Sequence, residues 1–304
     1  MVYRANQVVD KSQQTTSSNC VLLFHSIVDK ICFYRREFLF YQSNIDEKTD
    51  RPCAAQVVLT PAESKRLIAK AVAILPEVKR ALAQGTVIIA LGTTNAFVVE
   101  EILGINLSKS CYTAGYLGGG ELGTTSAKIR LGTYVLKKGK KVEMPVEEAL
   151  KGFGPEDVIV KGANAIDPWG NAGVLIGSDT GGTIGMALPV AVARRSHIIV
   201  PVGLEKLIPS VIEAASHFSL SRFKYRTGNL VGYMPLVNAR VLTETQALKV
   251  LCGVSATHVA SGGIGGSEGS IVLTIEGTEE DIDRAFALVK ALKGEPALSL
   301  PDHL

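Results

Sequence analysis

The chain has 304 residues, of which 46% are hydrophobic and 20% are charged, and its net charge is +3. These values are ordinary for a globular protein of one or two domains, and so small a net charge gives no reason to expect a nucleic-acid partner. The five cysteines are scattered without a C-x-x-C pair, which argues against a disulfide framework or a zinc site and favours a reducing, cytoplasmic compartment. No apolar run reaches the roughly 18 residues of a membrane helix, so no membrane partner is expected.

Residues 1–55 differ in composition from the rest of the chain. They contain three of the five cysteines, an aromatic and basic run at residues 33–38, and almost no glycine. They are either a packed extra arm or an upstream extension that plays no part in the fold, and composition favours the extension.

The first regular element is predicted to begin at Thr60. Thr60 and Glu63 have the spacing of a capping box, with Pro61 at the first helical position. A helix is expected from there to about Gln84, kinked or split by Pro76.

Residues 56–235 are predicted to form an α/β core. Continuous apolar runs at residues 87–91, 157–160 and 197–202 suit parallel strands that are covered on both faces. Helices are expected between these strands, which implies an open, mainly parallel, Rossmann-like sheet with right-handed crossovers. A strand at residues 128–136 and a short helix at 147–151 complete the expected core.

Residues 236–294 are predicted to form a ferredoxin-like α+β module, with a tail at residues 295–304. The pattern gives a strand, a helix, two strands and a second helix. These elements are expected at residues 237–242, from 243–246 onward, at 257–260, at 270–275 and from 278–281 onward. Such a module serves as a lid or an oligomerisation surface, or simply packs against the core.

The turn Gly92, Thr93, Thr94 and Asn95 follows a predicted strand and opens a helix. Free amides and the positive end of the helix dipole point out of such a turn, and the hydroxyl and amide side chains add hydrogen bonds. This arrangement suits a phosphate or another anion. The alternative is a plain strand-to-helix turn in which Thr94 caps the helix.

A second glycine-rich turn spans residues 177–185 and contains Gly181, Gly182 and Thr183 as candidate anion-binding residues. Asp179 either caps the following helix or faces the ligand as a base. Because ligands of open sheets lie at the carboxyl ends of the strands, both turns are expected to converge on one site.

Polar residues also follow the strand at residues 157–160. Lys161, Asn164 and Asp167 stand where the chemistry of open sheets usually occurs. Trp169 either walls the pocket or packs on the core. Glu121, in a glycine-rich loop, is either a nucleophile or part of a lid or turn. The histidines are dispersed, and no metal site is expected.

With these residues the chain resembles the superfamily of ribose-5-phosphate isomerase, glucosamine-6-phosphate deaminase and CoA transferases. Residues 87–104, VIIALGTTNAFVVEEILG, look like the isomerase's first strand, phosphate turn and helix. Residues 157–167, DVIVKGANAID, look like its Gly-Ala-Asp-Glu-Val-Asp strand end. The stretch through residue 202 is also similar to the methylthioribose-1-phosphate isomerase and initiation-factor 2B-like branch. The resemblance covers roughly residues 85–210 and implies a sugar-phosphate ligand.

The chain departs from this pattern at its acids. Lys161 replaces the acid before Gly-Ala, and Asn164 replaces the acid after it. Asp167 matches the final acid of the motif. Aldose–ketose isomerisation needs a general base, which Asn164 cannot be. The resemblance therefore supports the superfamily's fold and anion site for this chain better than it supports the superfamily's reaction.

Three functions are consistent with these residues. The first is an enzyme that binds a phosphorylated sugar-like or other anionic metabolite and isomerises it or transfers a group, with Asp167 or Asp179 as acid–base and Lys161 stabilising charge. The second is a non-catalytic metabolite sensor or complex subunit. The third is a CoA transferase with Glu121 as nucleophile and CoA as the one cofactor to consider. A homo-oligomer is expected in each case.

Overall fold

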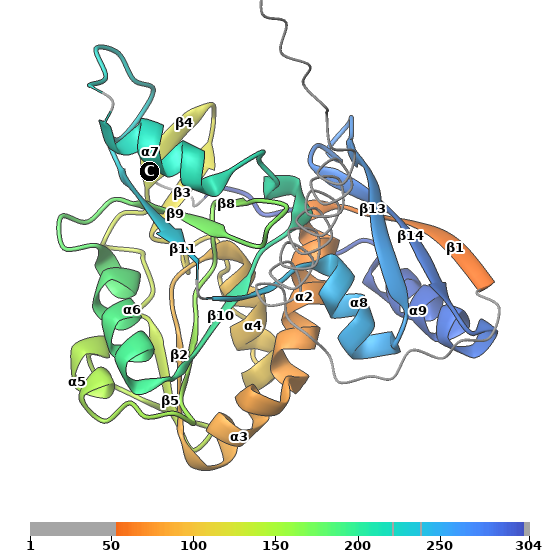
Figure 1. The fold of residues 1–304 in the computed structure, drawn as a ribbon, viewed down its shortest axis with the longest axis horizontal. Helices are drawn as coiled ribbons and strands as arrows, with labels where there is room; N and C mark the ends of the chain where they lie inside the picture. The colour runs from red at the N-terminus through yellow and green to blue at the C-terminus, as the bar shows by residue number, and fades with distance from the viewer. Residues whose placement is uncertain (1–52, 221, 238, 301–304) are drawn as a thin grey trace, which may run out of the picture.

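Six strands form one mixed sheet in the order β12-β10-β7-β2-β5-β6 (Figure 1). β12, β10, β7 and β2 run parallel, and β5 and β6 are antiparallel additions. In sheet order the strands are Arg240–Leu242, His197–Pro201, Val158–Val160, Thr86–Ile89, Tyr134–Lys137 and Lys140–Val142. The sequence-based prediction of a mixed α/β fold with a mostly parallel sheet is therefore confirmed.

The computed structural model describes residues 53–220, 222–237 and 239–300. The predictions for residues 1–52 and for the end of the tail lie outside these ranges. Within them, the strand predicted at residues 128–136 is observed only as Tyr134–Lys137.

Helices cover both faces of the large sheet. Strand residues alternate between two apolar clusters, so that Val158 and Val160 enter one cluster and Ile159 the other. The first cluster contains α2 (Pro61–Ile74), α3 (Pro76–Gln84) and α4 (Thr93–Leu103). The second contains α5 (Val146–Lys151) and α6 (Gly182–Arg194).

Local signals in the sequence explain where the first helices begin and end. The hydroxyl of Thr60 accepts the amide of Glu63, and the Glu63 carboxylate accepts the amide of Thr60, which is the predicted capping box. Pro76 splits the predicted helix into α2 and α3.

A second, antiparallel sheet has the order β1-β14-β13. Its strands are Cys53–Leu59, Ser270–Gly277 and Ser255–Gly262, and α8 (Glu244–Cys252) and α9 (Glu279–Leu292) pack against it. The strand expected at 237–242 pairs with β10 in the large sheet instead. The third strand of the antiparallel sheet is β1. In the sequence, β1 therefore precedes the α/β core, whereas β13 and β14 follow it.

Two small sheets and two further helices complete the described residues. One sheet has the order β11-β9-β8, from Gly232–Leu236, Ala172–Ile176 and Ala165–Ile166. The other is the hairpin of β3 (Gly115–Gly118) and β4 (Glu121–Thr124). The short 3-10 helix η1 (Leu204–Lys206) and the helix α7 (Val211–Leu220) follow β10.

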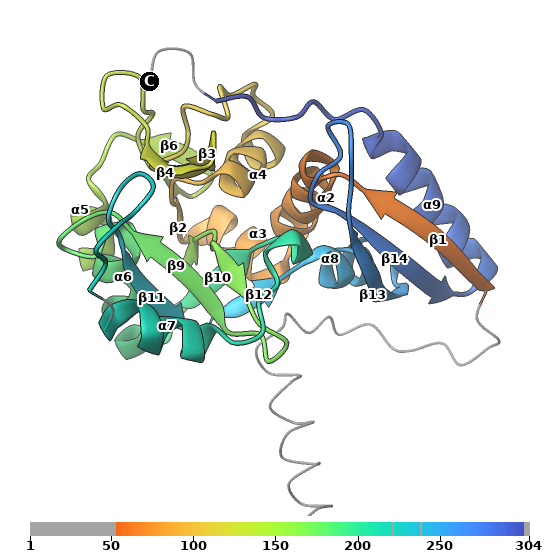
Figure 2. The same cartoon turned by 90° about the horizontal axis from the view of Figure 1, so that it is seen from above.

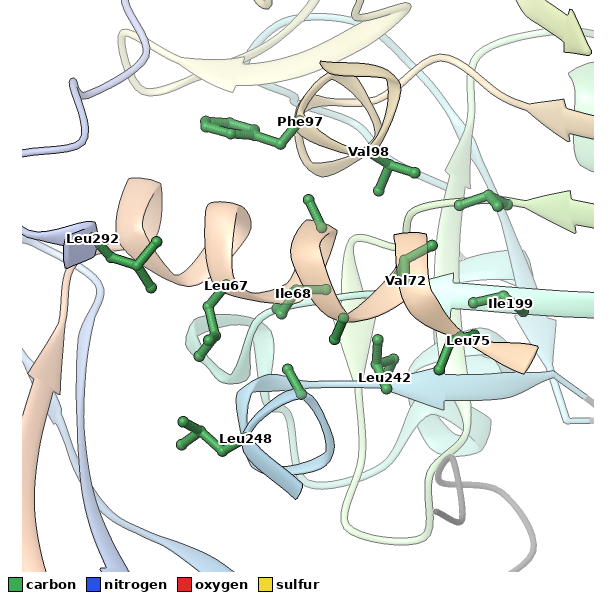
Figure 3. Packing of buried hydrophobic residues seen from close by; sticks show 14 of the residues in the cluster. Leu67, Ile68, Val72, Leu75, Phe97, Val98, Ile199, Leu242, Leu248 and Leu292 are labelled. Atoms are coloured by element: carbon green, nitrogen blue, oxygen red, sulfur yellow. The ribbon is translucent and has the colours of Figure 1, made fainter. Parts of the chain in front are cut away.

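Helix α2 lies between the two larger sheets (Figure 2). Its buried side chains meet Phe97 of α4, Leu242 of β12 and Leu248 of α8 in one apolar cluster (Figure 3). That cluster also contains Ile271 of β14, so both larger sheets share a core. In the described part of the chain, none of the helices has the length and apolar character needed to cross a membrane.

Candidate functional site

The first glycine-rich turn lies where β2 ends and α4 begins. The Gly92 amide donates to Tyr112 O, and Asn95 is fully buried. Asn95 Nδ2 donates to Ala90 O at 2.7 Å and Val160 O at 3.2 Å, which joins β2 to β7 at their carboxyl ends. The amides of Thr93 and Thr94 belong to the first helical turn, where no intrahelical acceptor exists.

The second glycine-rich turn faces solvent. Gly181 and Gly182 have φ of +80° and +59°, a backbone conformation that favours glycine, and residues 177–180 are exposed. A Cβ at Gly185 would lie 2.7 Å from Thr180 O, so these glycines serve the tight entry into α6. Thr183 is partly buried on the first turn of α6, and Asp179 is exposed. Side-chain capping of α6 by Asp179, one of its two predicted roles, is not observed.

The first of these turns lies next to the loop at residues 161–167. A Cβ on Gly162 would lie 3.8 Å from Asn95 Oδ1. The contacts of Gly181 and Gly185 are with each other, with Thr180 and with Met234. The first turn thus adjoins this loop, and the convergence of the second turn on the same site stays a prediction.

Asp167 is an organiser of its loop. It is completely buried, and its carboxylate accepts hydrogen bonds from the amides of Trp169, Asn171 and Val211 and from Asn171 Nδ2. A carboxylate with four donors at 2.9–3.0 Å has its lone pairs occupied. These contacts favour a structural role for Asp167 over the acid–base role predicted from the sequence.

Three other candidates also have local roles. The backbone N–H of Asn164 donates to Gly173 O, and its side-chain Oδ1 accepts the backbone N–H of Leu175. Both hydrogen bonds attach the loop to β9. Trp169 is 46% exposed and is not a core residue. Glu121 is exposed and follows the Gly119-Gly120 turn of the β3–β4 hairpin, in which both glycines have positive φ.

Lys161 belongs to a compact group of charged side chains, which we call the lysine–glutamate cluster: Lys65, Lys161, Glu205, Lys206 and Glu244. Lys161 directly follows β7, Lys206 lies in η1 after β10, and Glu244 opens α8 after β12. These three strands are adjacent and parallel, so their carboxyl ends bring the charged residues together. Lys65 joins them from the first turns of α2.

Hydrogen bonds and ion pairs define the geometry of this cluster. Lys161 Nζ donates to Gly162 O at 2.9 Å, and Lys206 Nζ donates to Ala163 O at 3.1 Å. Glu205 Oε1 lies 3.4 Å from Lys65 Nζ and 4.0 Å from Lys206 Nζ. Two ammonium groups are thus held on consecutive carbonyls of the loop, in which Gly162 adjoins the Asn95 side chain.

Burial lowers the pKa of both Lys161 and Lys206. Burial, and then the positive charge of Lys206, lower the pKa of Lys161 to about 8. Burial also lowers the pKa of Lys206, although the charge of Glu205 opposes this shift. Among the described residues, Lys161 has no carboxylate partner within ion-pair distance, whereas Lys206 and Lys65 both have Glu205. Within the described residues, Lys161 therefore lacks a carboxylate that would favour its charged form.

The glutamates of the cluster are unusually buried. Glu244 is fully buried, and its Oε2 accepts the Leu204 amide at 2.9 Å. Burial, and then the negative charge of Glu205, raise the pKa of Glu244 to about 7. A Cβ at Gly203 would lie 1.7 Å from Glu205 Oε2, so glycine is required there for Glu205 to fold back over the backbone.

Unpartnered polar atoms concentrate at the same edge of the sheet. Five buried side-chain oxygens have no hydrogen-bond partner among the described residues, and three of them are Asn95 Oδ1, Glu205 Oε2 and Glu244 Oε1. Native proteins pair nearly all buried polar atoms, and exceptions concentrate where function requires them. This edge is therefore the best candidate for a ligand site.

Sequence reasoning identified Lys161 and Asn95 but not the other charged residues of the cluster. Glu205 and Lys206 follow the predicted strand at 197–202, so the rule that locates ligands at carboxyl strand ends would have found them. Glu244 lies in the first turn of a predicted helix, a position that gave no sign of its burial. Lys65 looked like an ordinary charged helix residue.

No group of histidine, cysteine, aspartate and glutamate residues within the described ranges has the arrangement of a metal site. Comparison of the chain with protein-family models, with curated proteins and with solved structures finds no match.

Proposed function

We propose that this protein binds a small anionic metabolite of the phosphorylated-sugar class at the carboxyl ends of its parallel strands. Lys161 and Lys206 neutralise the charge of the ligand, and the first-turn amides of α4 donate hydrogen bonds to it. The observation that carries the proposal is the placement of two ammonium groups on the consecutive carbonyls of Gly162 and Ala163, in a loop whose Gly162 adjoins the buried Asn95.

The resemblance to sugar-phosphate isomerases supports the same ligand class. We also propose that the mostly parallel sheet is Rossmann-like, and that the antiparallel sheet with α8 and α9 is a ferredoxin-like module into which the core is inserted. The order β1-β14-β13 and the strand–helix–strand–strand–helix succession support that description.

Calorimetric titration tests the binding proposal. The probes are ribose 5-phosphate, ribose and inorganic phosphate, and the variants are Lys161→Met, Lys206→Met and the exposed control Lys140→Met. Removing either cluster lysine should weaken binding of the phosphorylated probe about tenfold or more, since a charge-assisted hydrogen bond contributes about 1.5–3 kcal/mol. Failure of every phosphorylated probe to bind, or equal loss in the control, would contradict the proposal.

A non-catalytic sensor with the same ligand is the second candidate. The full hydrogen bonding of Asp167 and the exposure of Asp179 favour it, because neither residue is placed as an acid–base group in the lysine–glutamate cluster. Proton NMR of the bound probe in deuterated buffer separates the two functions. Exchange of a carbon-bound proton indicates catalysis, and its absence under saturating protein favours the sensor.

A further inference from the structure

We propose that Lys161 is an amine nucleophile that forms a Schiff base with a carbonyl group of the bound metabolite. This inference rests on the proposed function for its substrate, a small phosphorylated aldehyde or ketone. It assigns covalent chemistry to a residue that the sequence suggested only as a stabiliser of charge.

The placement of Lys161 carries the inference. It follows β7, the strand between β10 and β2, at the sheet edge where Asn95, Glu205 and Glu244 leave buried oxygens unpartnered. Its Nζ has a carbonyl acceptor, Gly162 O, but no carboxylate within ion-pair distance among the described residues. A lysine that only held the fold together would be expected to have a carboxylate partner, as Lys65 does.

Burial, and then the neighbouring cation Lys206, supply the activation that an amine nucleophile needs. A lysine attacks a carbonyl only as the neutral amine, and burial next to a second cation is a known way to favour that form. With a pKa of about 8, Lys161 is about half neutral at pH 8, a fraction about 100-fold greater than for a lysine at the ordinary 10.5. Lys206 is the charge that faces Lys161, and Glu205, Lys65 and Glu244 act on Lys206 in turn.

The step is balanced with groups of the cluster. The neutral Nζ adds to the carbonyl carbon, and the amine proton passes to the former carbonyl oxygen to give a carbinolamine. This hydroxyl takes a second proton and leaves as water, so that nitrogen and carbon share the double bond of a protonated imine. Glu244 is the buried acid of the cluster that we assign as the donor, since its pKa of about 7 leaves its carboxyl about half protonated at pH 7.

Reductive trapping of the full chain tests the inference. Dihydroxyacetone phosphate is incubated with the protein and sodium cyanoborohydride, which reduces an imine to a stable secondary amine, and the labelled peptide is identified by mass spectrometry. Lys161 should be labelled at least tenfold faster than the exposed Lys140, with a rate that rises to a midpoint near pH 8. Lys161→Arg should abolish this label while it retains the charge, and Lys140→Arg should not change it.

The outcomes separate this inference from the proposed function. Tight binding of phosphorylated probes without label on Lys161 overturns the Schiff base and leaves the binding proposal standing. If dihydroxyacetone labels Lys161 as fast as dihydroxyacetone phosphate does, the result supports Lys161 as an amine nucleophile and contradicts the phosphate site. Labelling of Lys161 at the rate of Lys140 overturns the inference, and so does an unchanged label pattern in Lys161→Arg.

Discussion

At the scale of single residues, hydrogen bonding separates two aspartates that look equivalent in the sequence. Asp167 is fully buried and its carboxylate accepts four hydrogen bonds, whereas Asp179 is exposed. The acceptor-only character of a carboxylate fits four donors. An amide in its place would turn an NH₂ group toward at least one donor.

Asp167→Asn should therefore lower the free energy of unfolding by about 2–4 kcal/mol, because buried donors lose their charged acceptor. The matched variant Asp179→Asn should change it by less than about 0.5 kcal/mol, since exposed substitutions rarely do more. Urea denaturation of both variants measures the difference. Equal, small effects would show that Asp167 does not organise its loop.

Glu244 predicts a pH dependence of stability. Its pKa is raised to about 7 in the folded protein, from an ordinary value of 4.5, by burial and by the charge of Glu205. The folded state thus holds its proton more tightly than the unfolded state, and the contribution to stability is complete below pH 4.5 and lost as pH rises through about 7.

The free energy of unfolding should fall between pH 4.5 and 8 by an amount on the order of 2 kcal/mol. This pH dependence should be absent from Glu244→Gln. Glutamine keeps an oxygen for the Leu204 amide and cannot ionise. Thermal and urea unfolding across this pH range give the profile, with the exposed Glu276→Gln as control. A Glu244→Gln profile parallel to that of the unchanged protein would refute the assignment.

At the scale of elements, Arg66 fastens α2 to α4 and to the segment after α9. Its guanidinium makes two hydrogen bonds with Glu295 at 2.9 and 3.0 Å, and others with Glu100 and Glu101. It also lies 4.6 Å from the ring centroid of Phe97. The side chain is only 15% exposed, so the network is weakly screened by water.

Arg66→Met should cost about 3 kcal/mol of stability, because it removes the cation paired with Glu295 and one of the two cations paired with Glu100 and with Glu101. Arg80 offers a matched control: its pair with Glu156, at 3.3 Å, is more than half exposed on both sides. Arg80→Met should cost less than about 1 kcal/mol. Chemical denaturation that finds equal costs would show the Arg66 network to be unimportant.

The helices and strands also show that features set by nearby residues could be predicted from the sequence, whereas the pairing of distant strands could not. The capping box at Thr60 and the strand at residues 157–160 depend on neighbours within a few positions, and each is confirmed. The pairing of β1 with β14 and of β12 with β10 joins segments far apart in the chain, and periodicity carries no information about it. The strand at 240–242 was for this reason placed in the wrong sheet.

The same contrast holds for the candidate site. Lys161 and Asn95 were predicted because each lies directly after an apolar strand. The burial of Glu244 and its proximity to Glu205 depend on how three strand ends come together, which no local pattern encodes. Asp167 was predicted as an acid–base group because its place after an apolar strand does not reveal its hydrogen bonds. Three of them come from Trp169 and Asn171, within four residues, and the fourth comes from the distant Val211.

At the scale of the whole molecule, the two larger sheets share one apolar cluster. Leu248 of α8 is fully buried in it, together with residues of α2, β14 and the large sheet (Figure 3). Trp169, the only tryptophan, lies in the loop between β8 and β9 and does not belong to this cluster. Its fluorescence can therefore report unfolding of the part of the molecule that contains the large sheet when the substitution is made in α8, beside the antiparallel sheet.

Leu248→Ala should lower stability by about 2–4 kcal/mol through the cavity that it leaves in the cluster. If the shared core makes the described chain one cooperative unit, Trp169 fluorescence and far-ultraviolet circular dichroism should shift to lower urea together and by the same amount. Val192→Ala is the matched control, because Val192 is 50% exposed and its loss should leave both transitions in place. A Trp169 transition that stays fixed while circular dichroism splits into two steps would show that the antiparallel sheet with α8 and α9 unfolds on its own, despite the apolar residues it shares with α2.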